Sequence, residues 1–72
     1  MKFQVVFSFD EEYQGYVADV PELPGCISQG KTLDEAMDNV REAIQGYLEV
    51  LADRGEPYQP SKRSILVGEV AV

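Results

Sequence analysis

The first part of the chain alternates between apolar and polar side chains with a period of two. From Phe3 to Asp10, phenylalanine and valine occupy every second position and polar residues occupy the others, with only Val6 out of place. This alternation is typical of a strand with one buried face. The next run, Tyr16 to Val20, is aromatic and β-branched, and the polar residues before it end in Gly15. The two runs therefore predict an antiparallel hairpin with a longer loop.

Two prolines predict that the chain leaves the sheet directly after this second strand. Pro21 and Pro24 each fix φ and lack an amide donor, and each disfavours a helical conformation in the residue before it. Gly25 then permits a tight reversal of the backbone. We expect residues 26–29 to form a short third strand after this bend.

A spacing of three to four residues between apolar positions follows the bend and predicts one long helix. Thr32 precedes Glu35 by three residues, which is the spacing of a capping box and predicts a helix from Leu33 to about Arg54. Gly55 and Pro57 are placed to end it. Acidic residues fall opposite an apolar stripe that should cover the sheet. The stripe consists of Leu33, Ala36, Met37, Val40, Ile44, Tyr47, Leu48 and Leu51.

The C-terminal residues 64–72 are rich in β-branched side chains and predict a last strand. As an exposed edge this strand would promote aggregation, so it should pair either within the sheet or with another chain. The predicted order is β-β-β-α-β. We therefore expect an α+β fold in which a three- to four-stranded, mainly antiparallel sheet is covered by one long amphipathic helix. Residues 1–72 should form a single domain.

The bend and the helix start resemble the N-terminal domain of the HicB antitoxin family over roughly residues 3–51. Members share a Pro-x-Leu-Pro-Gly-Cys bend followed by a Gly-x-Thr-x-x-Glu-Ala helix start. The matching residues here are Pro21, Leu23, Pro24, Gly25, Cys26, Gly30, Thr32, Glu35 and Ala36. The resemblance implies a truncated ribonuclease-H-like sheet and an antitoxin that masks a small basic ribonuclease toxin of the HicA type. Full-length HicB proteins add a DNA-binding module after this domain, and we expect no operator binding from the present sequence.

The charge balance agrees with a basic protein partner. The chain has 13 acidic and 6 basic residues and a net charge of −7, which repels nucleic-acid phosphates and favours docking of a basic protein. We therefore expect no direct binding of DNA or RNA. The residues predicted to contact the partner are acids near the hairpin and the bend, namely Glu11, Glu12, Asp19 and Glu22.

Self-association is also expected, because a chain this short buries only about 60% of its extended surface. A flank of small residues, Asn39, Ala43, Gly46 and Val50, runs beside the apolar stripe. Gly46 costs about 1 kcal/mol relative to alanine within a helix, and a close neighbour would explain it. That neighbour is either a strand of the same domain or another chain, as in an oligomer that uses Ala43, Gly46 and Val50. An orphan domain that only self-associates is the alternative function.

The sequence offers few reactive side chains. There is no histidine, and Cys26 has no cationic neighbour nearer in sequence than Lys31, so we expect a small buried side chain there and no zinc site. Asp10 and Asp19 are the strand-borne candidates for a metal-dependent nuclease, which would need three or four converging carboxylates. We therefore expect no enzyme, no cofactor and no metal. A single cysteine and the lack of a signal segment or membrane span favour the cytoplasm.

Overall fold

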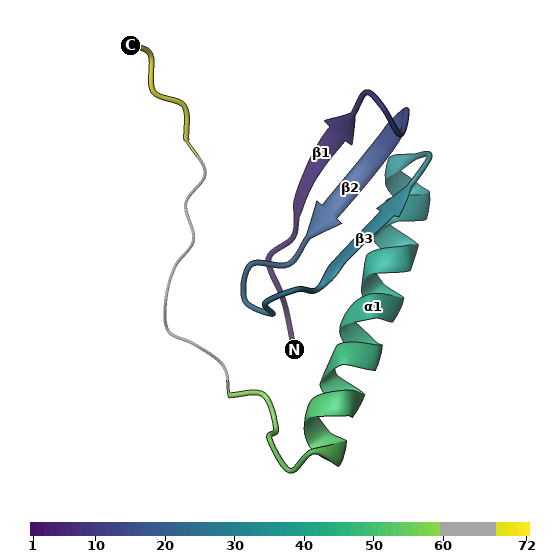
Figure 1. Ribbon diagram of the computed structural model, residues 1–72, viewed down its shortest axis with the longest axis vertical. Helices are drawn as coiled ribbons and strands as arrows, with labels where there is room; N and C mark the ends of the chain where they lie inside the picture. Colours follow the sequence, from purple (N-terminus) through teal and green to yellow (C-terminus); the bar gives the residue numbers. More distant parts are fainter. Residues whose placement is uncertain (60–67) are drawn as a thin grey trace.

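The computed structural model describes residues 1–59 and 68–72 of the chain. These residues form β1 (Val6–Asp10), β2 (Gly15–Asp19), β3 (Ile27–Gly30) and α1 (Leu33–Asp53). The strands make one antiparallel sheet in the order β1-β2-β3, and α1 lies along one face of it (Figure 1). The α+β prediction of an antiparallel sheet followed by one long helix is confirmed.

The hairpin between β1 and β2 is held by the residue that ends β1. The Asp10 carboxylate accepts hydrogen bonds from the amides of Glu12 at 2.9 Å and Tyr13 at 3.1 Å, and the Asp10 carbonyl accepts one from the amide of Gln14 at 2.8 Å. Aspartate commonly closes turns in this way because its short side chain reaches amides two and three residues on. The predicted hairpin is therefore present, and β1 begins at Val6 and not at Phe3.

The proline bend is closed by three backbone hydrogen bonds and by one buried side chain. The amide of Val20 donates to the Cys26 carbonyl at 3.0 Å, the amide of Leu23 to Val20 at 3.1 Å, and the amide of Cys26 to Leu23 at 2.9 Å. Gly25 has a φ of 82°, so the predicted reversal uses a conformation that side chains disfavour. Leu23 is only 1% exposed, and the bend is therefore part of the core.

Both ends of α1 match their sequence signals. Thr32 accepts a hydrogen bond from the amide of Glu35 at 3.1 Å, and the helix starts at Leu33 as predicted. At the other end the amide of Glu56 donates to the Leu51 carbonyl at 2.8 Å, and Gly55 has a φ of 72°. Together with the hydrogen bond of 3.0 Å from the Gly55 amide to the Ala52 carbonyl, this bond forms a Schellman motif, which requires the left-handed conformation that glycine adopts most easily.

The helix covers β2 and β3 more than β1 and extends past the strands toward the bend (Figure 1). Ala36 and Val40 are buried against the sheet as predicted, whereas Leu33 is 45% exposed and Met37 44% exposed. The expectation that these two stripe residues lie in the core is wrong: α1 packs mainly on β2 and β3, and Met37 instead lines a groove between the helix and β1. The core consists of Ala18, Val20, Leu23, Cys26 and Val40, packed against Phe3, Val5, Phe7, Ala43, Ile44, Tyr47, Leu48 and Tyr58.

The predicted last strand, residues 64–72, falls partly outside the part of the chain that the structure describes. Residues 64–67 are not among the described residues, and residues 68–72 have no strand conformation. Val70 is 87% exposed, so this end of the chain is not packed on the sheet. No helix in residues 1–59 and 68–72 is both long enough and apolar enough to cross a membrane.

Candidate protein-binding surface

The four acids predicted to bind a partner lie at two opposite ends of the sheet. Glu11 and Glu12 belong to the turn between β1 and β2, whereas Asp19 ends β2 and Glu22 lies in the bend. The register pairs Asp10 with Gly15 at one end of the hairpin, and Asp19 with Val6 at the other. A strand of five residues, about 17 Å long, separates the two pairs of acids. The structure therefore does not join the four acids into one surface.

The two ends also differ in how their acids are engaged. Glu11 and Glu12 are exposed on the turn. Glu22 accepts a hydrogen bond of 2.6 Å from the hydroxyl of Tyr58, whose ring lies 5.2 Å from the ring of Phe3. Glu22 thus helps to hold the segment after α1 against the sheet, while Asp19 is exposed. Of the two acids near the bend, Glu22 is therefore engaged in a hydrogen bond within the chain, and Asp19 is exposed.

The two carboxylates considered for metal binding do not converge. Asp10 uses its carboxylate to close the turn, and Asp19 lies at the far end of the same hairpin. Within residues 1–59 and 68–72, no three side chains of histidine, cysteine, aspartate or glutamate come together in a way that would hold a metal ion. Because two-metal hydrolysis requires several carboxylates around one site, the described geometry does not fit that chemistry.

The only cysteine is buried, as expected from its sequence neighbours. Cys26 is 4% exposed and packs with Val20 and Leu23 in the core. Burial, and then the negative charge of the nearby Asp19, raise the pKa of the Cys26 thiol. A thiol with a raised pKa holds its proton at neutral pH and is a poor nucleophile. Cys26 therefore acts as a small apolar side chain.

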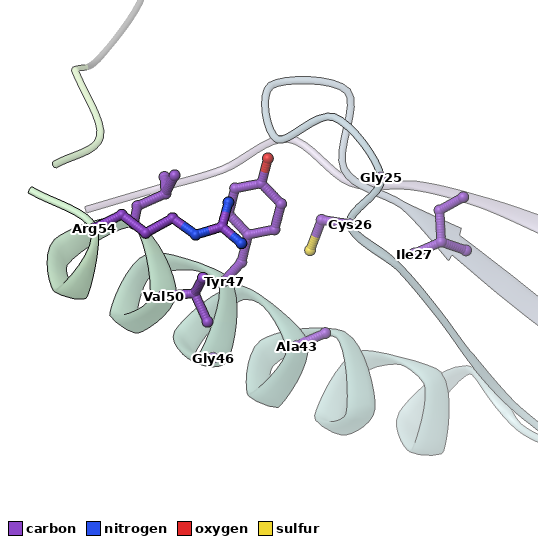
Figure 2. A pocket seen from close by; sticks show the side chains of 9 residues that line it. Gly25, Cys26, Ile27, Ala43, Gly46, Tyr47, Val50 and Arg54 are labelled. Atoms are coloured by element: carbon purple, nitrogen blue, oxygen red, sulfur yellow. The ribbon is translucent and has the colours of Figure 1, made fainter. Parts of the chain in front are cut away.

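A groove of about 410 Å³ opens where α1 extends past β3, and we call it the α1–β3 groove. Residues 25–27 form one wall, and Figure 2 shows the Cys26 thiol and the Tyr47 ring between this wall and the helix. The Tyr47 hydroxyl donates a hydrogen bond of 3.0 Å to the Pro24 carbonyl and so holds the helix at a fixed distance from the bend. The other wall is formed by Ala43, Gly46, Tyr47, Val50, Leu51 and Arg54.

All three residues predicted to form an oligomer flank, Ala43, Gly46 and Val50, line this groove. At the N-terminal end of this flank, a strand of the same chain is the neighbour, because Asn39 donates a hydrogen bond of 2.8 Å to the Gln29 carbonyl of β3. Lower down, a side-chain carbon built on Gly46 has no heavy atom within 4 Å. In the described part of the chain, no strand therefore approaches Gly46, and its role in an oligomer stays a prediction.

A second groove of about 580 Å³ lies on the opposite side of α1, beside β1, which is an edge strand in the described part of the chain, and we call it the α1–β1 groove. The sequence did not indicate it, because the pattern shows which side chains are apolar but not that the helix leaves β1 uncovered. Among residues 1–59 and 68–72, its only charged lining residue is Arg41, which forms an ion pair with Asp38 at 3.2 Å. One wall consists of Met1, Phe3, Val5 and Phe7, and the other of Met37, Val40, Arg41, Ile44, Gln45 and Leu48.

Comparison with known proteins agrees with the fold and the bend motif. The family model for the HicB-like antitoxin of bacterial toxin-antitoxin systems matches residues 3–68. A UPF0150 protein of Thermoplasma acidophilum is 48% identical over 56 residues, which are 78% of this chain and 80% of that protein. A UPF0150 protein of Archaeoglobus fulgidus is 56% identical over 50 residues, which are 69% of this chain and 71% of that protein.

A solved structure extends the comparison from sequence to fold. The crystal structure of the N-terminal domain of Burkholderia pseudomallei antitoxin HicB matches with a TM-score of 0.77 and 36% sequence identity. The match covers 89% of this chain and 74% of that chain. Together with the family model over residues 3–68, it shows that this chain belongs to the HicB-like antitoxin family.

Proposed function

We propose that this protein is an antitoxin that neutralises a small basic ribonuclease toxin of the HicA type by masking it. The observation that carries the proposal is the match of the HicB-like antitoxin family over residues 3–68. Membership of an antitoxin family implies a toxin partner and points away from catalysis. The acidic composition adds support, because a net charge of −7 attracts a basic protein.

Masking requires a surface and not a reactive group. An acidic protein accelerates the approach of a basic partner, and packing at the contact then determines how long the complex lasts. A toxin held in this way would be kept from its RNA by steric exclusion and by the negative charge of the antitoxin. We place this encounter in the cytoplasm, where a ribonuclease toxin meets its substrate.

The proposal predicts that a gene for a small basic protein lies beside the gene for this chain, and that protein is the partner used in the test. The two proteins are produced together, one of them tagged, and the purified complex is assayed for ribonuclease activity before and after dissociation. We expect a complex without activity and a released partner with activity. Either the absence of a complex, or a complex as active as the released partner, would contradict the antitoxin function.

Self-association without a toxin is a second candidate, favoured by the edge of β1 that no strand of residues 1–59 and 68–72 pairs with, and by the adjoining α1–β1 groove. An uncovered edge strand beside apolar side chains is a surface that proteins usually cover. Light scattering on the purified chain distinguishes the candidates. An oligomer that forms alone and captures no basic partner would support the orphan domain.

A further inference from the structure

We propose that the α1–β3 groove is the toxin-binding site, and that it receives an apolar side chain flanked by basic residues of the toxin. The assignment rests on the proposed antitoxin function and adds the surface through which it works. Ala43, Gly46 and Val50, which were predicted to contact a second copy of the chain, line this groove and would contact the toxin instead.

The α1–β3 groove is open and mostly apolar. Ile27 is 58% exposed and Val50 is 49% exposed, one on each wall. Neither Gly25 nor Gly46 would bring an added side-chain carbon within 4 Å of another heavy atom. The base of the groove is closed, because Cys26 is buried there and the Tyr47 hydroxyl forms a hydrogen bond with the Pro24 carbonyl of the bend. A space of this kind accepts the side chain of another protein without rearrangement of its own walls.

Acidic side chains surround the α1–β3 groove. Glu42, Glu49 and Asp53 lie four residues before, three after and seven after Gly46, and therefore share its side of the helix. All three are exposed. Asp19 lies close to Cys26 on the opposite wall. Carboxylates thus flank both walls of the groove, and among the described residues Arg54 is its only charged lining residue.

This charge pattern favours a basic partner over a second copy. Two copies of a chain with a net charge of −7 that met through this groove would bring two rows of carboxylates together. Like charges placed close together at an interface cost binding energy, whereas the lysine and arginine side chains of a basic toxin would be attracted. In the described lining, each groove has one arginine and no carboxylate; beside the α1–β1 groove, however, the nearby Asp38 is already engaged in an ion pair with Arg41.

Gly46 and Gln45 are neighbours in sequence but line different grooves, so the same substitution at each position tests which groove binds the toxin. Gly46→Leu places a leucine in the α1–β3 groove, and Gln45→Leu places the same side chain in the α1–β1 groove. Both positions are exposed on the helix, so neither variant should prevent folding. In titrations with the purified toxin, we expect Gly46→Leu to weaken binding by more than about tenfold, as expected for an obstruction at the packed centre of an interface. Gln45→Leu should bind as the wild type does.

A second pair of variants tests the charge. The double variant Glu42→Lys with Glu49→Lys reverses the acids beside the groove, and Glu11→Lys with Glu12→Lys reverses two acids at the far end of the hairpin. Both variants carry the same net charge, so only position distinguishes them. We expect the first pair to slow toxin association by more than about tenfold at low salt and the second pair to have a smaller effect. Circular dichroism confirms that each variant is folded.

The outcomes separate this assignment from the proposed function. If the wild-type protein does not bind the toxin, both are overturned. If the wild type binds and Gly46→Leu binds equally well, only the assignment of the groove is overturned. The assignment also fails if Gln45→Leu or the variant at Glu11 and Glu12 causes the larger loss. It fails as well if Gly46→Leu leaves toxin binding intact but lowers the mass of the free protein in light scattering, since a second copy would then occupy the groove.

Discussion

Gly30 lies just before α1 and Gly46 lies within it. Substitution of alanine at these two positions is expected to change the free energy of unfolding in opposite directions. Gly30 ends β3 directly beneath the first turn of α1. An added side-chain carbon there would lie 2.3 Å from the Ala36 amide nitrogen and 2.7 Å from the Glu35 carbonyl carbon, whereas ordinary contacts are 3.4–4 Å. Both neighbours are backbone atoms, so no side chain can rotate away to make room.

The cost of Gly30→Ala follows from how firmly the helix start is held. Roughly 1 Å of movement is needed to restore ordinary contact, in an interior packed as densely as an organic crystal. The Thr32 cap and the hydrogen bond from Asn39 to the Gln29 carbonyl both oppose that movement. Overpacking of this kind costs about 1–3 kcal/mol or more. A chain of 72 residues has a free energy of unfolding of about 4–11 kcal/mol, so the loss is a large fraction of the total.

Gly46→Ala is the matched substitution at an open site. The added carbon has no heavy atom within 4 Å, and alanine is better than glycine in a helix by about 0.8–1.0 kcal/mol. We expect urea unfolding, followed by circular dichroism, to show Gly30→Ala less stable than the wild type and Gly46→Ala more stable. In thermal unfolding, each kcal/mol should shift Tm by about 4–8 °C for a domain of this size. The reasoning is refuted if Gly30→Ala is as stable as the wild type, or if Gly46→Ala is destabilised.

Two further predictions concern the core. Leu23→Ala should lower the free energy of unfolding by about 2–5 kcal/mol in the same urea assay, because Leu23 is 1% exposed and its removal leaves a cavity under the bend; an exposed control such as Leu33→Ala should cost clearly less. Since burial raises the pKa of the Cys26 thiol, the folded state keeps a proton that the unfolded state loses. Stability should therefore be unaffected by this group below about pH 8.5 and fall as the pH rises through the folded pKa. Cys26→Ala should show a smaller fall between pH 7 and 10, and equal slopes for the two proteins would contradict the reasoning.

The features predicted correctly from sequence are those that a few neighbouring residues determine. Thr32 and Glu35 form the helix cap within one turn, and Gly55 ends the helix by adopting a left-handed conformation. The proline bend is equally local, because its hydrogen bonds join Val20, Leu23 and Cys26. In each case the chemistry of adjacent residues leaves one favourable backbone path.

The features that were missed depend on how wide and how long the packed elements are. Leu33 and Met37 have the spacing of core residues, yet both are exposed, and Met37 lies over the groove that α1 leaves beside β1. The acids at Glu11 and Glu12 were grouped with Asp19, although a hairpin with five-residue strands already places them at opposite ends. The two grooves likewise arise from the position of α1 over β2 and β3, which no local pattern encodes.

The length of α1 links the fold to the proposed function. Its 21 residues extend about 30 Å, whereas strands of five residues extend about 17 Å. The C-terminal part of the helix therefore passes beyond the sheet (Figure 1), and in the described part of the chain the bend contacts one side of it through Tyr47 and leaves Val50 49% exposed. A toxin seated in the α1–β3 groove would cover the other side. Binding to the folded state alone adds about 2.7 kcal/mol of stability when the toxin is at 100 times its Kd. Against a total of about 4–11 kcal/mol, the antitoxin would then be substantially more stable when bound than when free.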